Sequence, residues 1–346
     1  MTPRLFIEYC WMGKDYKMNM APIVVFAYNR PDHLRRTLDA LSKNELAEES
    51  ILYIYCDGPK ALATSAESID KGLQRSAQRF FSGSPEEYKE YCRSIEECLE
   101  LAQSQTWPKE LHVIPRETNW GLARSIVGAV TEIVNRYGRV ITLEDDIVTS
   151  KGFLRYMNDA LELYKDEDKV MHVSAYMYPH KGRLQETFFY PVPYPGGGWA
   201  TWARAWMYYD DNNENVYNKW AGRWKEFDVL GGDYLSQQMK DNYNGVIHTW
   251  FVKWHAALLG HNAFALYPHQ SLTNNIGFDD QATNCYPTNR FDVAVLADTI
   301  TVERIPLIVN KKASRIIYAF YQGHWYNRRR RKALIKKVVQ YLAFWK

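Results

Sequence analysis

The sequence predicts an α/β fold in which a mostly parallel central sheet is flanked by helices. Short apolar runs alternate with helical stretches through the first half of the chain, and a polar cluster follows several of the runs. The first run, Ile23–Ala27, is continuously apolar, as expected for a strand buried on both faces. Residues 33–46 follow it, and their Leu34, Leu38 and Leu41 mark one face of an amphipathic helix.

The same alternation continues to residue 173. Strands are predicted at residues 51–55, 111–114, 140–143 and 170–173, and helices through about residue 105 and at 123–137 and 152–164. Strand and helix in this order imply parallel strands joined by helical crossovers. Residues 179–235 differ, because they are rich in Pro, Gly and Trp and predict long loops with short helices. We find no internal repeat, so one compact unit is expected.

Composition narrows the class of protein. A net charge of +3 argues against nucleic acid as the main partner. Five scattered cysteines predict no disulfide framework and suit a reducing compartment. No signal peptide and no apolar window of membrane-spanning length are visible, so a cytoplasmic location is expected. Aromatic residues reach 15%, a surplus that suits either stacking on sugar rings or extra core.

Three polar clusters follow predicted strands: Asn29-Arg30, Asp57-Gly58 and Glu144-Asp145-Asp146. In parallel sheets, ligands bind outside the carboxyl ends of the strands. We therefore expect these clusters to meet at one edge of the sheet and to form a ligand site there.

The acidic triplet is the strongest single signal. Strand alternation would point Glu144 and Asp146 one way and Asp145 the other. Crowded carboxylates repel unless a cation or hydrogen-bond donors compensate, and Mg²⁺ or Mn²⁺ prefers such oxygen ligands and shares its shell with phosphate oxygens. A divalent metal is therefore the predicted cofactor. A helix cap or a solvated acidic turn is the simpler alternative.

Six segments together resemble GT-A fold glycosyltransferases, in particular bacterial family 2-like sugar transferases and N-acetylglucosaminyltransferase I. The likeness spans residues 21 to about 286, and its specificity lies in the order and spacing of the segments. They are Pro22–Pro31, Asp57–Pro59, Asn119–Arg124, Leu143–Asp146, Gly198–Trp202 and Asn275–Phe278.

The resemblance implies a role for each matching residue. Arg30 and Asp57 would line the base pocket, and Asp57 would accept from the uracil ring nitrogen. Arg124 would lie near the diphosphate or donor sugar. Glu144 would contact the sugar, Asp145 the ribose and Asp146 the metal. Gly198 and Trp199 would border the donor sugar and the acceptor. A turn-forming Asp, a surface Arg and a Trp-anchored core loop are the structural alternatives.

An inverting transfer, which the resembled enzymes imply, needs a base for the acceptor hydroxyl. Asp233, after two glycines, is the first candidate, and His248 is the second, at a position where similar sequences often carry Asp. Asp280, with its neighbour Asp279, is the third. Relatives tend to have His where this chain has Asn284, which leaves a third metal ligand open.

The chain thus divides into a leader of little expected order (1–20), a nucleotide-sugar-binding half (21–175), an acceptor-binding and catalytic half (176–322) and a basic amphipathic tail (323–346). Within the tail, residues 328–346 suit an anionic membrane surface, and hence peripheral attachment at its inner face. The predicted function is Mn²⁺- or Mg²⁺-dependent transfer from a UDP-sugar to a glycan or glycolipid acceptor of lipopolysaccharide or capsule type. An inactive transferase or carbohydrate-binding module is the alternative. A nucleotidyltransferase is disfavoured, because Asn29-Arg30-Pro31 is not a Gly-rich phosphate loop.

Overall fold

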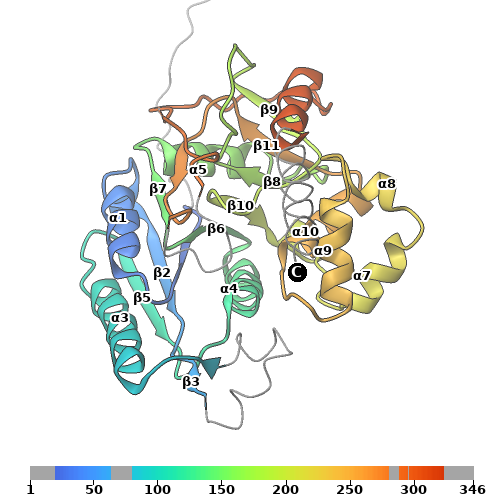
Figure 1. The fold of residues 1–346 in the computed structure, drawn as a ribbon. Coiled ribbons are helices and arrows are strands. Elements are labelled where there is room, and N and C mark those ends of the chain that lie inside the picture. Colours follow the sequence, from blue (N-terminus) through green and yellow to red (C-terminus); the bar gives the residue numbers. More distant parts are fainter. Residues whose placement is uncertain (1–19, 64–79, 280–287, 295, 323–346) are drawn as a thin grey trace, which may run out of the picture.

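A computed structural model describes residues 20–63, 80–279, 288–294 and 296–322. An eight-stranded sheet lies at its centre (Figure 1), in the order β5-β2-β1-β6-β10-β8-β11-β9. Strands β10 and β9 run antiparallel to their neighbours, and the other six share one direction. The strands are β5 Glu110–Pro115, β2 Ile51–Cys56, β1 Ile23–Ala27, β6 Arg139–Glu144, β10 Trp199–Trp202, β8 Val170–Ser174, β11 Phe264–Pro268 and β9 Thr187–Tyr190. The mostly parallel α/β fold is therefore confirmed.

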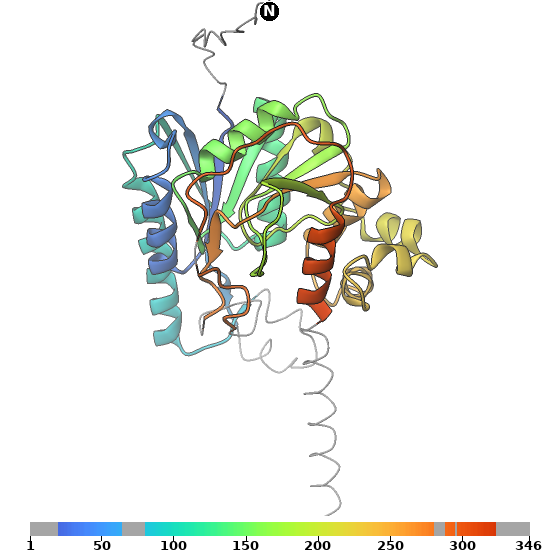
Figure 2. The same ribbon diagram turned by 90° about the horizontal axis from the view of Figure 1, so that it is seen from above.

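Helices cover both faces of this sheet (Figures 1 and 2). Alternate residues of β1 divide between two cores: Val24 and Phe26 join one, and Ile23 and Val25 join the other. The Ile23 core is covered by α1 Pro31–Leu41, α3 Pro85–Gln103 and α5 Phe153–Leu163. The Val24 core is covered by α4 Leu122–Tyr137, α6 Ala203–Trp206, α7 Asn213–Trp220, α8 Trp224–Phe227, α9 Tyr234–Tyr243 and α10 Phe251–Gly260.

Three smaller elements lie beside the main sheet. A short ribbon pairs β7 (Ile147–Thr149) antiparallel with β12 (Thr273–Asn275), and thereby brings residues 273–277 beside the acidic triplet. β3 (Ala61–Leu62) pairs with β4 (Phe80–Phe81), and a 3₁₀ turn covers Ala47–Glu49. None of the described helices is long and apolar enough to cross a membrane.

Two local predictions were wrong. The helix predicted over residues 33–46 ends at Leu41, because the chain turns at Ser42 and Leu46 adopts a left-handed backbone with φ of 70°. The region 179–235, predicted as loops and short helices, does contain the short helices α6, α7 and α8, but it also contributes the unpredicted strands β9 and β10 to the main sheet. β10 lies between β6 and β8, so the two predicted halves share one sheet. Residues 1–19 and 323–346, predicted as leader and tail, lie outside the described residues.

Candidate functional site

The strand order creates a switch point between β1 and β6. From β1 the chain moves outward to β2 and β5, and it then returns to the other side of β1 as β6. The strand order therefore reverses between β1 and β6, and α/β sheets bind ligands outside the carboxyl ends of their strands at such a point. Arg30 follows β1, Asp57 follows β2 and Glu144–Asp146 ends β6, so the structure brings the three predicted polar clusters to this edge.

Arg30 and the acidic triplet form the centre of the site. β6 ends at Glu144, and Asp145 and Asp146 lie in the turn that follows. Arg30 donates through Nη2 to a carboxylate oxygen of Asp145 and, at 2.8 Å, to Oδ2 of Asp146. The expectation that Asp145 and Asp146 point in opposite directions was wrong, because strand alternation stops where the strand ends.

Burial and crowding favour the protonated forms of two carboxyls in this cluster. Burial, with the charges of Asp146 and Asp145, raises the pKa of Glu144 to about 8. Burial also raises the pKa of Asp145 to about 6, although the neighbouring Arg30 guanidinium opposes the rise. One guanidinium thus offsets only part of the negative charge that three carboxylates would carry, and a second cation would be stabilised here.

Asp146 has an atom suited to such a cation. Its Oδ1 is buried and accepts no hydrogen bond within the part of the chain that the structure describes. Gly277 packs against this carboxylate so closely that a Cβ there would overlap Asp146 Oδ2. The described residues include no group of three or more His, Cys, Asp or Glu side chains placed to hold a metal. One free carboxylate oxygen nevertheless fits Mg²⁺-type binding, which uses one or two carboxylates with substrate phosphates and water.

Asp57 holds the loop that leads into α4. Its Oδ1 accepts from the backbone N–H of Trp120 at 2.7 Å, and its Oδ2 accepts from that of Gly121 at 2.9 Å and from Asn119 Nδ2 at 2.9 Å. A carboxylate is well placed here, because the first N–H groups of a helix are unpaired and carry partial positive charge. Contact with a uracil ring stays a prediction, since these bonds already engage both oxygens.

Arg124 lies on the first turn of α4 and stacks on Trp120, with its guanidinium carbon 3.9 Å from the ring centre. Arg116, which the sequence reasoning missed, stacks on the same ring at 3.8 Å. Both cations lie next to the loop that Asp57 holds. The position of Arg116 could have been noticed, because it lies just beyond the predicted strand at residues 111–114 and directly after the observed β5.

Trp199 occupies a different environment from the polar clusters. It begins β10, is 2% exposed and stacks on Trp250 with ring centres 5.0 Å apart. His172 stacks on it as well. Gly198, with φ of 76°, packs against Phe153 and Leu143. The structure therefore places both residues in the packed interior, and direct sugar contact through Trp199 stays a prediction.

Two of the three candidates for the catalytic base lie on the surface, away from these contacts. Asp233 is exposed at the start of α9, and His248 is exposed in the loop between α9 and α10. Among the described residues, no hydrogen bond or ion pair joins either side chain to Arg30 or the acidic triplet. Asp280, the third candidate, and Asn284 lie outside the described residues, whereas Asp279 is described and contacts His33.

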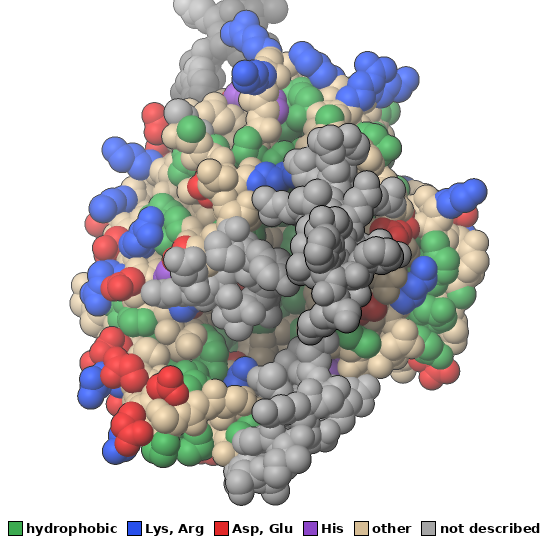
Figure 3. All heavy atoms as spheres, viewed as in Figure 1, with side chains coloured by type: hydrophobic (Ala, Val, Ile, Leu, Met, Phe, Trp, Pro, Cys, Tyr) green, Lys and Arg blue, Asp and Glu red, His purple; other side chains and the backbone are tan. Residues whose placement is uncertain are grey.

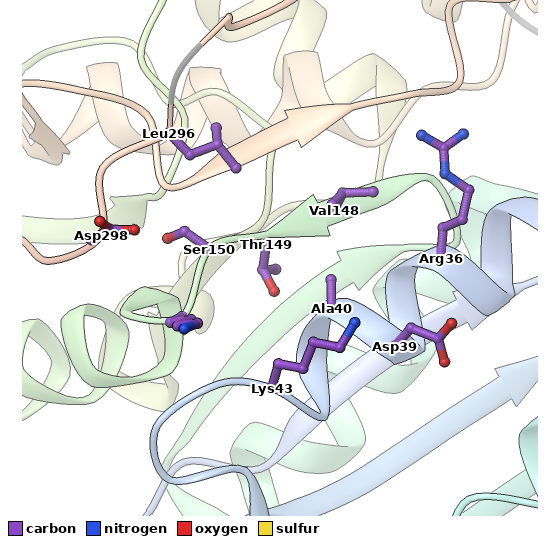
Figure 4. Close-up of a pocket in the computed structure, with 10 residues that line it drawn as sticks. Arg36, Asp39, Ala40, Lys43, Val148, Thr149, Ser150, Leu296 and Asp298 are labelled. Carbon is purple, nitrogen blue, oxygen red and sulfur yellow. The ribbon is translucent and has the colours of Figure 1, made fainter.

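A separate hollow lies on the outer side of α1 and β7 (Figure 4). Its volume is about 610 Å³, and it contains none of the predicted site residues. Its charged side chains are mixed in sign: Arg36, Lys43, Lys151, Asp39 and Asp298. On the face of the molecule shown in Figure 3, basic and acidic side chains are interspersed. Because no charge of one sign gathers in the hollow, the switch point at the carboxyl ends of β1 and β6 is the better candidate site.

Comparisons with known proteins give only distant matches. No family model matches the chain, and no curated protein matches it. Among solved structures, TarS of S. aureus aligns with a TM-score of 0.33 and 12% identity over 73% of this chain, and the chain spans 36% of TarS. Mouse xyloside xylosyltransferase 1 aligns with a TM-score of 0.33 and 9% identity, covering 70% of this chain and 82% of its own. Similarity at this level assigns no function, so the assignment depends on the site.

Proposed function

We propose that this chain is a metal-dependent, inverting glycosyltransferase that moves a sugar from a UDP-sugar to a surface-glycan acceptor of lipopolysaccharide or capsule type. One observation carries the proposal: Arg30 and the buried carboxylates Asp145 and Asp146 meet at the switch point of a mostly parallel sheet. The order of the segments that resemble GT-A enzymes supports the same assignment. Inversion, the donor base and the acceptor class follow from that resemblance alone.

The charges of the site suit a nucleotide diphosphate. Asp146 would hold Mn²⁺ or Mg²⁺ through Oδ1, the buried oxygen that accepts no hydrogen bond among the described residues. Such a cation, when bound, offsets the charge that develops on the departing diphosphate. Two unit charges about 4 Å apart interact by about 4 kcal/mol at an effective dielectric of about 20, which is enough to change a rate strongly.

The chain's own residues would bind and orient the donor. Arg30 was expected in the base pocket, but its guanidinium contacts Asp145 and Asp146. We therefore propose that it binds phosphate oxygens, whose geometry its planar set of donors matches. Arg124 is exposed beside the loop that Asp57 holds, which is the part of the sheet edge where the nucleotide base is proposed to bind. Glu144 and Asp145 lie beside Asp146, where the donor sugar and ribose are proposed to contact them.

The acceptor side is proposed from sequence. Asp233 remains the first choice for the base that takes the acceptor proton, followed by His248 and Asp280. Peripheral attachment to an anionic membrane would depend on residues 328–346, outside the described residues. Co-sedimentation with anionic liposomes tests it: the full chain should bind, a chain truncated after Gln322 should not, and equal binding would refute membrane attachment through the tail.

Manganese-dependent hydrolysis of UDP-sugars by the purified chain tests the proposal directly. A thermal-shift screen of nucleotide sugars, with and without Mn²⁺, identifies the donor first. Metal-dependent hydrolysis that Asp146→Asn removes and Asp39→Asn preserves is the expected result, because Asp39 is an exposed carboxylate on α1. Glycan binding without affinity for any nucleotide would instead indicate a carbohydrate-binding module.

A further inference from the structure

Helix α1 presents a polar stripe to the site. Arg30 directly precedes the helix. His33 and Thr37 lie within it, at the spacing after Arg30 that places all three residues on one helical face. Arg30 binds the side chains of Asp145 and Asp146, and Thr37 donates through its hydroxyl to the backbone carbonyl of Asp145 at 2.8 Å. Thr37 is fully buried and His33 is 5% exposed. The stripe thus holds the acidic turn by both side chain and backbone.

His33 carries the stripe to a second segment, Ile276–Asp279. Its Nε2 lies 3.0 Å from Asp279 Oδ2 and 3.3 Å from the backbone carbonyl oxygen of Ile276. Both partners accept hydrogen bonds, so Nε2 carries the proton that is shared between them. The other ring nitrogen, Nδ1, is buried and makes no hydrogen bond to any described residue.

The segment that His33 contacts lies directly on the candidate metal ligand. Ile276 donates its backbone N–H to the carbonyl of Asp146 at 2.9 Å, which continues the β7–β12 ribbon. Gly277 then packs against the Asp146 carboxylate and Arg30, with no room for a side chain. Phe278 stacks on Phe291 at 4.9 Å. Residues 276–279 therefore form one wall of the cluster, fixed at one end by the ribbon and at the other by His33.

We propose that His33 is a positioning residue: through Asp279 and Ile276 it fixes the wall formed by residues 276–279 against Asp146 and Arg30, and thereby sets the diphosphate end of the donor site. The contact joins α1 to a segment more than 240 positions away in sequence. The inference rests on the proposed function, because it assigns the wall to a diphosphate-binding site. His33 itself need not touch the donor.

Titration calorimetry tests the assignment without requiring turnover: it measures the binding of UDP, GDP and dTDP in the presence of Mn²⁺. His33→Leu removes the Nε2–H donor and should weaken binding of the preferred nucleotide about tenfold, the value of one strong hydrogen bond. His33→Gln keeps an N–H donor near the Nε2 position and should bind within about twofold of the wild type. A purely structural role would not distinguish these two variants in affinity while both stay folded.

Asp279→Ala provides the second arm, because this side chain is 45% exposed and its loss leaves the core intact. It should weaken binding by less than His33→Leu does, because the contact of His33 with the Ile276 carbonyl remains. The double variant should bind no more weakly than His33→Leu alone. Asp39→Asn, on the exposed side of α1, is the matched control and should bind as the wild type does.

The outcomes separate the two proposals. A wild type that binds nucleotide while His33→Leu and Asp279→Ala bind equally well would overturn the role of His33 and leave the proposed function standing. Additive losses in the double variant would also overturn it, since the two residues would then act separately. A wild type that binds no nucleoside diphosphate would overturn the proposed function and the assignment of His33 together.

Discussion

The switch-point edge and the aromatic interior beneath α9 and α10 both contain side chains that suit sugar chemistry, but the fold uses them in opposite ways. At the edge, Arg30, Asp145 and Asp146 converge from two strands and leave one carboxylate oxygen free of hydrogen bonds within the described chain. In the interior, Trp199 packs among Trp206, Trp250 and Trp254 and is 2% exposed. Position at a strand end thus indicates a site better than residue type does.

The largest effect is expected when a negative charge is removed from the switch-point edge. Asp146→Asn removes the charge from the proposed metal ligand and should lower the rate of nucleotide-sugar hydrolysis about a thousandfold, equivalent to about 4 kcal/mol in the barrier. The circular dichroism spectrum should not change, because the amide keeps the volume of the carboxylate. Hydrolysis rates with Asp39→Asn as control decide it, and retained activity would count against Asp146 as metal ligand.

Truncating the interior should act on stability instead. Trp199→Ala opens a cavity in a cluster of indole rings and should lower the free energy of unfolding by about 3 to 5 kcal/mol, as large core truncations do. Urea unfolding measures the loss. Trp199→Phe keeps an aromatic ring and should lose less. A loss in unfolding free energy below about 1 kcal/mol, together with impaired donor binding, would indicate that Trp199 acts in the donor site and not in the core.

Asp57 combines features of both regions. It lies at the carboxyl edge of the sheet, but its hydrogen bonds stabilise the loop that leads into α4. Asp57→Asn turns one acceptor into a donor that faces the N–H groups of Gly121 and Asn119. We expect a loss of about 1 to 2 kcal/mol in unfolding free energy, the range for a lost helix cap. If stability were unchanged and nucleotide affinity fell, Asp57 would belong to the base pocket alone.

The interior also predicts an acid sensitivity that the edge does not explain. Burial lowers the pKa of His172 to about 3, against 6.5 ordinarily. Between these values the unfolded chain takes up a proton that the folded chain excludes, so this stabilising contribution is complete above pH 6.5 and is lost as pH falls. His172→Phe should reduce the slope of unfolding free energy against pH by about 1.4 kcal/mol per unit between about pH 4 and 6.

Urea titrations at several pH values measure that slope. His112→Phe is a suitable control, since His112 is partly exposed on β5. An unchanged slope in His172→Phe would show that His172 is protonated in the folded chain.

The sequence predicted those strands that a local pattern of residues is enough to identify. Short, mostly apolar runs identified β1, β2, β5, β6 and β8. Of these, β1 is continuously apolar, because a strand covered on both faces needs no alternation. β10 escaped this reasoning. Its apolar residues divide between two cores, with Trp199 in one and Trp202 in the other. It also lies antiparallel between β6 and β8, two strands that precede it in the sequence. Glycines and tryptophans in that segment indicated a loop, since only the tertiary partners make it a strand.

The site shows the same division. Strand ends predicted that Arg30 and the acidic triplet would meet, but not that Arg30 would bind Asp145 and Asp146 together. Residues that reach the site from far away in sequence were given no role. Gly277 was noted only as part of the segment Asn275–Phe278, and it matters because β12 pairs with β7; His33 was not singled out, and it matters because Asp279 lies beside it. The spacing of Arg30, His33 and Thr37 on one helical face was the available signal for the second.

A crystal structure of the chain with Mn²⁺ and UDP tests the central claim most directly. The account predicts a metal ion bound by an Asp146 carboxylate oxygen at about 2.0 to 2.2 Å, with diphosphate oxygens completing its coordination beside Arg30. A nucleotide bound elsewhere, with the carboxyl ends of β1 and β6 free of metal and phosphate, would contradict it.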